Sequence, residues 1–210
     1  NMVEKGAEKL SGMILWWADL SGPKILPGEY TIELNVNGNK QRKNFTVLPN
    51  PDMETDMSGL KKQHDFITDV NNTIDKAHKS IKKIHKINEQ LKAFQQQYKG
   101  NEKVKPLVEK AKKMQEGFDE IEKTLYQTQN KSSQDPLNFP IKLTNKLAHL
   151  NALVGMGDFP PTQQDIDVKN EMTAKINKQL EEFDQMVDKQ IEEFNRNFNQ
   201  MNLNYIFLKE

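Results

Sequence analysis

The four histidines come first, because histidine can act as a general base or as a metal ligand. His78 and His85 lie seven positions apart in a segment with helical periodicity, which puts their Cα atoms about 10.5 Å apart. A metal shared along one helix needs ligands three or four positions apart, and no H-E-x-x-H motif occurs. His64, His78 and His85 all flank the apolar positions of that helical segment, and His149 lies in another helical segment. We therefore expect structural histidines and no metal site.

Carboxylates occur in adjacent pairs within segments of helical periodicity. Adjacent residues point in different directions around a helix, whereas glycosidase chemistry needs two carboxyl groups facing each other across a cleft. The sequence also contains no G-x-S-x-G, P-loop or G-x-G-x-x-G motif. We predict no catalytic residue and no cofactor. The pairs are Asp119–Glu120, Glu181–Glu182 and Glu192–Glu193.

Composition narrows the class of partner. The chain has 210 residues, with 30 basic and 30 acidic side chains, so no net charge attracts nucleic acid or an anionic membrane. Arg42 and Arg196 are the only arginines, and no aromatic residues are interleaved with the lysines, which argues against nucleic-acid binding. No apolar run is long enough for a membrane span. Cysteine is absent, which excludes thiol catalysis and disulfides but leaves the cellular compartment open.

The first fifty residues have the pattern of β-strands. Apolar residues alternate from Tyr30 to Val36, and Asn37-Gly38 is a strong hairpin signal, because both residues tolerate positive φ. A return strand is expected over 43–48, and the apolar run Met13–Ala18 predicts a further, buried strand. Three or perhaps four strands are too few for a β-sandwich, which needs about seven. The missing strands are expected to lie upstream of this sequence.

After Pro51 the periodicity becomes helical. Apolar residues at Leu60, Ile67, Ile74 and Ile81 repeat every seven positions, as in a coiled-coil seam. Prolines and glycines divide the rest of the chain into further helical segments, and Thr162 is a good N-cap for the last helix. The expected helices cover about 57–98, 102–129, 140–155 and 162–202.

Helix lengths indicate how these segments pack. At 1.5 Å per residue the first and last helices are each roughly 60 Å long, and the two middle ones together nearly match them. A bundle of three rods, with one rod broken at the proline-containing loop, is therefore natural, and an up-down four-helix bundle is the alternative. Tyr205 and Leu208 continue the spacing of the last helix almost to the end of the sequence. We divide the chain into a β region at 1–50 and a helical bundle at 53–210.

The loops around the third helix carry the candidate binding residues. Prolines and phenylalanines in these loops can pack, so the connections are structured rather than flexible. They could cap the end of the bundle, or they could form a docking surface for another domain or partner. The candidate docking residues are Pro136, Phe139, Pro140, Phe159 and Pro160.

Two stretches carry a resemblance to a known family. They are GPKILPGEYTIELNVNG with FTVLPNPD, and YQTQNKSSQDPLNFPIKLTNKLAHLNALVGMGDFPPT. They resemble the C-terminal region of large secreted bacterial proteins of the sortilin-like, BNR (Asp-box) repeat, glycosyl-hydrolase-like family. In that family a β-propeller is followed by an immunoglobulin-like β-sandwich and then by a helical tail. No Asp-box of the S-x-D-x-G-x-T-W kind occurs in this sequence, so the resemblance transfers no catalytic residue.

The resemblance implies a fold class and a role. The expected fold is α+β and mainly α, with the last strands of an immunoglobulin-like β-sandwich followed by a long antiparallel three- or four-helix bundle. The expected role is a non-catalytic structural or interaction module of an exported β-propeller protein. Its partners would be upstream domains of the same polypeptide, or another protein of the cell envelope. Alternatives are an accessory part of a glycoside hydrolase whose active site lies on the propeller, and a coiled-coil adaptor.

Overall fold

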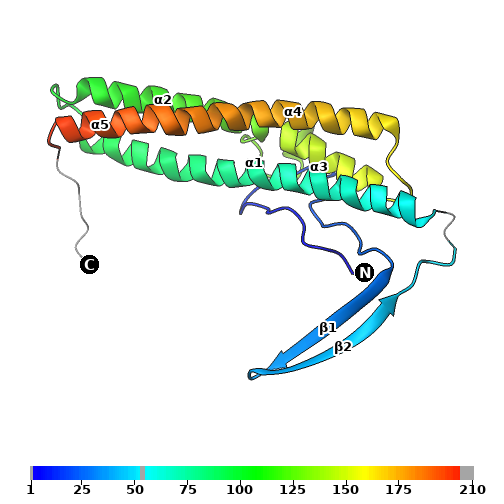
Figure 1. Cartoon of the computed structure of the whole chain (residues 1–210). Helices are drawn as coiled ribbons and strands as arrows, with labels where there is room; N and C mark the ends of the chain where they lie inside the picture. The colour runs from blue at the N-terminus through cyan, green and yellow to red at the C-terminus, as the bar shows by residue number, and fades with distance from the viewer. Residues whose placement is uncertain (1, 53–54, 204–210) are drawn as a thin grey trace.

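A computed structural model describes residues 2–52 and 55–203, and Figure 1 shows their arrangement. The molecule is mainly helical, with a two-stranded antiparallel hairpin followed by four packed helices. The helical rods lie side by side, and the hairpin projects from one end of the bundle (Figure 1). The elements are β1 (Gly28–Val36), β2 (Asn39–Val47), α1 (Met57–Gln97), α2 (Lys105–Leu125), a 3₁₀ turn (Asp135–Leu137), α3 (Leu143–Val154), α4 (Gln163–Gln185), a π-helical turn η2 (Met186–Ile191) and α5 (Glu192–Gln200).

Helix α1 is the longest helix of the bundle. Its 41 residues begin after Asp56, whose side chain accepts a hydrogen bond from the Gly59 amide and so caps the first turn. The chain leaves the helix through Gly100, whose φ of 80° is accessible to glycine without strain. The predicted seven-residue seam is confirmed, since all four of its members are buried and two of them, Ile74 and Ile81, are fully buried.

Helices α2 and α3 share the length of α1 between them. The side chain of Asn88 on α1 donates to Asp119 on α2, whereas Gln63, nearer the start of α1, donates to the carbonyl of Val154 at the end of α3. Each of the two shorter helices therefore covers a different half of α1. The four helices form three rods, which is one of the two arrangements that the helix lengths left open, and the middle rod is broken in the loop that contains the 3₁₀ turn (Figure 1).

The third rod runs through α4, η2 and α5 without a break, for 38 residues. Thr162 and Asp165 form a reciprocal capping box at its start, which confirms the predicted N-cap. Beside the π-helical turn, Met186 packs against α2 at Gly117, where an added Cβ would lie 2.7 Å from the methionine methyl group. The rod ends at Gln200, and the predicted helical positions Tyr205 and Leu208 lie outside the described residues.

The predicted hairpin is confirmed, but the sheet is smaller than expected. Tyr30 pairs with Phe45, and Asn37 and Gly38 form the turn with φ of 50° and 85°, as a type I′ turn requires. Within the described residues the sheet has two strands rather than three or four. The strands make almost all of their tertiary contacts with each other, so the hairpin projects away from the helices (Figure 1).

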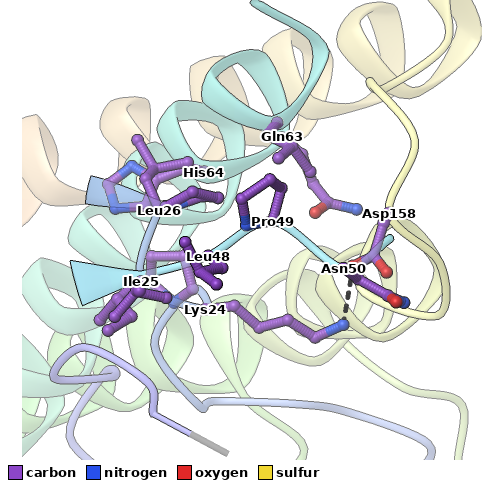
Figure 2. Close-up of a pocket in the computed structure, with 13 residues that line it drawn as sticks. Lys24, Ile25, Leu26, Leu48, Pro49, Asn50, Gln63, His64 and Asp158 are labelled. Atoms are coloured by element: carbon purple, nitrogen blue, oxygen red, sulfur yellow. Dashed lines mark hydrogen bonds and ion pairs between the residues drawn. The ribbon is translucent and has the colours of Figure 1, made fainter. Parts of the chain in front are cut away.

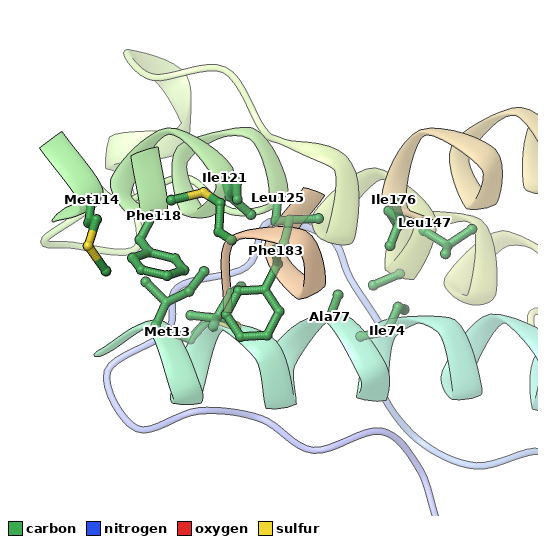
Figure 3. Packing of buried hydrophobic residues seen from close by; sticks show 14 of the residues in the cluster. Met13, Ile74, Ala77, Met114, Phe118, Ile121, Leu125, Leu147, Ile176 and Phe183 are labelled. Carbon is green, nitrogen blue, oxygen red and sulfur yellow. The ribbon is translucent and has the colours of Figure 1, made fainter. Parts of the chain in front are cut away.

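The predicted strand at Met13–Ala18 is wrong. This run lies within an irregular segment, residues 2–26, that follows the surface of the bundle; we call it the strap. Met13 is buried and belongs to the same hydrophobic cluster as Phe118 of α2 and Phe183 of α4 (Figure 3). The apolar run therefore contributes to the helical core and not to a sheet.

Side chains of the helical bundle provide the hydrogen bonds to the main chain of residues 14–17 that a neighbouring strand would otherwise provide. The Asn145 side chain on α3 accepts from the Trp16 amide at 2.7 Å and donates to the Trp16 carbonyl at 2.8 Å. The Tyr126 hydroxyl accepts from the Ile14 amide, and His149 donates to the Trp17 carbonyl. Since a buried backbone needs a partner for each polar group, these side chains account for the extended conformation without a strand.

Two glycines let the strap fold back on itself. Glu4 donates to the Pro23 carbonyl and Ala7 donates to the Leu20 carbonyl, so residues 2–7 run antiparallel to residues 20–25. At Gly22 an added Cβ would lie 2.0 Å from the Glu4 carbonyl oxygen, and at Gly6 it would lie 1.9 Å from the Leu20 carbonyl oxygen. The two halves of the strap can approach this closely because neither position has a side chain.

Candidate docking surface

The histidines do not converge on a site. The His85 imidazole lies 2.6 Å from a Glu122 carboxylate oxygen between α1 and α2, and His64 pairs with Glu4 of the strap at 2.9 Å. His78 is buried under the strap, and its Nδ1 donates to the Glu8 carbonyl at 2.5 Å. Burial lowers the pKa of His78, which favours the neutral ring. Throughout residues 2–52 and 55–203, no three histidines or carboxylates are placed to hold a metal ion.

The paired carboxylates point apart, as the sequence predicted for a helix. Asp119 accepts from Asn88 in the α1–α2 contact, whereas its neighbour Glu120 faces solvent and pairs with Lys123. Glu193 of α5 pairs with Lys110 of α2 at 2.6 Å, so it makes an ion pair between two helices. No helix in the described part of the chain is long and apolar enough to cross a membrane.

The five predicted docking residues fall into two groups. Pro136, Phe139 and Pro140 precede α3, whereas Phe159 and Pro160 follow it. The 12 residues of α3 separate the groups by about 18 Å, so the five lie in two loops at opposite ends of this helix. Phe139 is half-buried, whereas Phe159 is 68% exposed.

The loop between α3 and α4 displays several apolar side chains to solvent. Besides Phe159, Met156 is 73% exposed and Leu153 is also exposed. The Phe159 ring lies over Gly157, where an added Cβ would be 2.7 Å from a ring carbon. Leu153 lies in the last turn of α3, so three large exposed apolar side chains occur within seven positions. Exposed apolar patches mark interaction sites. The spacing of Leu153 suggested a core position, and the isolated Met156 gave no periodic signal.

This loop is tied to the base of the hairpin. Lys24, just before β1, makes an ion pair with Asp158 at 2.9 Å (Figure 2). Gln63 of α1 donates to the Gly157 carbonyl at 2.7 Å. Between them lies an open pocket of about 250 Å³, whose walls include Leu48, at the end of β2, and His64. The pocket is too shallow and mixed in polarity to define a small-molecule site, but it makes the hairpin base and the loop neighbours.

The hairpin carries a second exposed apolar surface. Ile32 and Leu34 are each 60% exposed and Val36 is 53% exposed, all on the same face of β1. At the base of this face Tyr30 stacks on Phe45, with ring centroids 5.9 Å apart. An isolated hairpin is marginally stable in water, so this face is suited to contact with another apolar surface.

We call these two surfaces together the docking end. The docking end comprises Ile32, Leu34 and Val36 of the hairpin, Leu153 in the last turn of α3, and Met156 and Phe159 of the α3–α4 loop. The loop and the base of the hairpin lie at the end of the bundle where α1 begins and α3 ends, and the strands slant away from the helices from there (Figure 1). At the other end an apolar groove of about 630 Å³ runs between α1 and α5, with Phe94 and Phe194 in edge-to-face contact at 5.0 Å.

Comparison with known proteins finds no family model, no curated protein and no solved structure that matches this chain. The likeness to sortilin-like proteins therefore rests on the two sequence stretches alone.

Proposed function

We propose that this chain is a non-catalytic structural and interaction module of a larger, exported β-propeller protein of the sortilin-like kind. In this proposal the helical bundle is a rigid support, and the docking end binds a β-rich domain that precedes it in the same polypeptide. The export and the propeller come from the sequence resemblance. The choice of surface comes from the exposed side chains.

The observation that carries the proposal is the exposure of apolar side chains at one end of a well-packed bundle. The bundle buries its own seams, including Ile81 and Ile121. The hairpin, in contrast, leaves both of its edges and its apolar face uncovered. A contact with an apolar partner surface would remove Ile32, Leu34 and Phe159 from water, at roughly 25 cal/mol per Å² of apolar area.

A binding experiment with the two parts produced separately tests this proposal. The chain would be mixed with the polypeptide encoded immediately before it, and association would be measured by calorimetry. We expect binding that Phe159→Ser weakens by about tenfold, because the substitution removes a large apolar contact.

Leu137→Ser is the matched control. Leu137 is 70% exposed, and Phe159 is 68% exposed. Leu137, however, lies in the loop before α3, at the end of that helix that is far from the docking end. We expect this variant to bind as the wild type does. Failure of the wild-type parts to associate, or equal weakening by both substitutions, would refute the proposal.

A further inference from the structure

The two free edges of the hairpin differ in how they are protected. Strand β2 contains Lys40, Arg42 and Lys43, and charged residues on an edge discourage pairing with another chain. Strand β1, GEYTIELNV, contains no lysine, arginine or proline. Its charged residues are Glu29 and Glu33, so the β1 edge lacks the basic side chains that protect the β2 edge.

The apolar face of the hairpin belongs mainly to β1. Tyr30, Ile32, Leu34 and Val36 lie on this face, and the β2 residues opposite the last three are Lys43, Gln41 and Asn39. The apolar residues thus form a stripe along β1 rather than a surface shared equally by the strands. A third strand beside β1 would lie next to this stripe, whereas a strand beside β2 would lie next to polar residues.

The opposite face of β1 carries Glu29 and Glu33, and the side chains of β2 that pair with them show which groups complement this face. Arg42 donates to Glu33 at 2.6 Å, Lys40 pairs with the same carboxylate, and the Thr46 hydroxyl donates to Glu29. Strand β2 therefore meets β1 with basic and hydroxyl groups on the polar face. A strand on the free edge of β1 would meet the same two carboxylates from the other side.

We propose that the free edge of β1 accepts an additional β-strand whose residues alternate between apolar and basic or hydroxyl side chains. This inference rests on the proposed function, because it specifies how the partner joins the docking end. Main-chain hydrogen bonds would provide most of the affinity, and the alternating side chains would provide the specificity. The antiparallel direction is expected, since antiparallel pairing is the more stable per residue.

A peptide based on β2, NKVRVNFTV, is the probe for the free edge. Valines replace the residues that correspond to Gln41 and Lys43, so that one face of the peptide is mainly apolar and the other carries basic and hydroxyl groups. Its affinity for the full chain would be measured by fluorescence anisotropy, against a charge-reversed peptide, NEVEVNFTV. We expect the basic peptide to bind at least about tenfold more tightly, because it complements Glu29 and Glu33.

Two neighbouring substitutions locate the binding. Leu34→Gln removes an apolar side chain from the stripe, and Asn35→Gln introduces the same residue on the opposite face of the same strand. We expect Leu34→Gln to weaken binding about tenfold and Asn35→Gln to leave it nearly unchanged. Equal affinities of the two variants would contradict the inference, because that result is expected of a peptide that binds without contacting the apolar stripe of β1.

Amide hydrogen exchange on the wild-type chain provides a measurement that does not depend on a folded variant. At saturating basic peptide, the outward amides of β1 should exchange more slowly, while those of β2 should not change. Protection of β2 alone, or of neither strand, would overturn the inference. If the peptide protects β1 but the preceding polypeptide does not bind, the β1 edge does accept an additional strand, whereas the proposed function is wrong.

Discussion

Individual residues hold the strap in place, and Gly22 is the most constrained of them. Gly22→Ala would push a methyl group against the Glu4 carbonyl, so the two halves of the strap would have to separate. We expect a loss of about 1–3 kcal/mol in the free energy of unfolding, measured by urea denaturation. Ser21→Ala, one position away and exposed, should change stability by less than about 0.5 kcal/mol. An equal effect of both substitutions would show that the approach at Gly22 is not the cause.

Asn145 replaces a β-strand partner for one residue of the strap. Asn145→Ala would leave both polar backbone groups of Trp16 without their bonds in a partly buried position. We expect a loss of about 2–3 kcal/mol of stability, and a change in tryptophan fluorescence, because both tryptophans of the chain lie in the strap. Lys146→Ala, on the exposed side of the same turn, is the control and should leave both quantities unchanged. Wild-type fluorescence and stability in Asn145→Ala would contradict this role.

At the scale of elements, the contact between strap and α1 should weaken in acid. Burial lowers the pKa of His78 below its ordinary value of 6.5, and its Nε2 has no partner among the described residues. The unfolded chain therefore takes up a proton at higher pH than the folded chain does. The contribution of a neutral His78 is fully present above pH 6.5 and decreases as the pH falls below it.

A pH series of unfolding free energies checks this prediction. The wild type should lose stability between pH 6.5 and 4.5, by at most about 1.4 kcal/mol per pH unit, and His78→Gln should lose clearly less. Glu8 and Asp75, beside His78, have pKa values lowered by Lys82 and Lys79, respectively, so their stabilisation is lost only at more acidic pH. Parallel pH profiles for wild type and His78→Gln would exclude His78 as the titrating group.

Sequence patterns predicted the elements better than they predicted the strap. The seven-residue spacing around Ile74 and the Asn37-Gly38 turn were sufficient for α1 and the hairpin, because both signals are local. The run Met13–Ala18 has the composition of a buried strand, but its partners are Tyr126 and side chains of α3, more than 110 positions away. No local pattern distinguishes an apolar strand from an apolar segment bound by helix side chains.

At the scale of the whole molecule, the candidate site was only partly predictable. Phe159 and Pro160 interrupt a helical pattern in the sequence, and the structure places them in the exposed loop at the docking end. Pro136 and Phe139 interrupt the pattern in the same way but lie beyond the other end of α3. Helices α2 and α3 pack on different halves of α1, and this packing determines which loops lie at the same end of the bundle. It depends on contacts between distant parts of the chain, so the sequence pattern does not reveal it.

The most direct test of the docking end compares amide hydrogen exchange in this chain alone and in a longer polypeptide that includes the region encoded before it. If the docking end binds that region, the amides of β1 and of the loop after α3, residues 155–159, should become protected in the longer polypeptide. Amides at the far end of the bundle, near Gly100, should exchange at the same rate in both. Unchanged exchange of β1 and of the loop would contradict the central claim that this end of the molecule is an interaction surface.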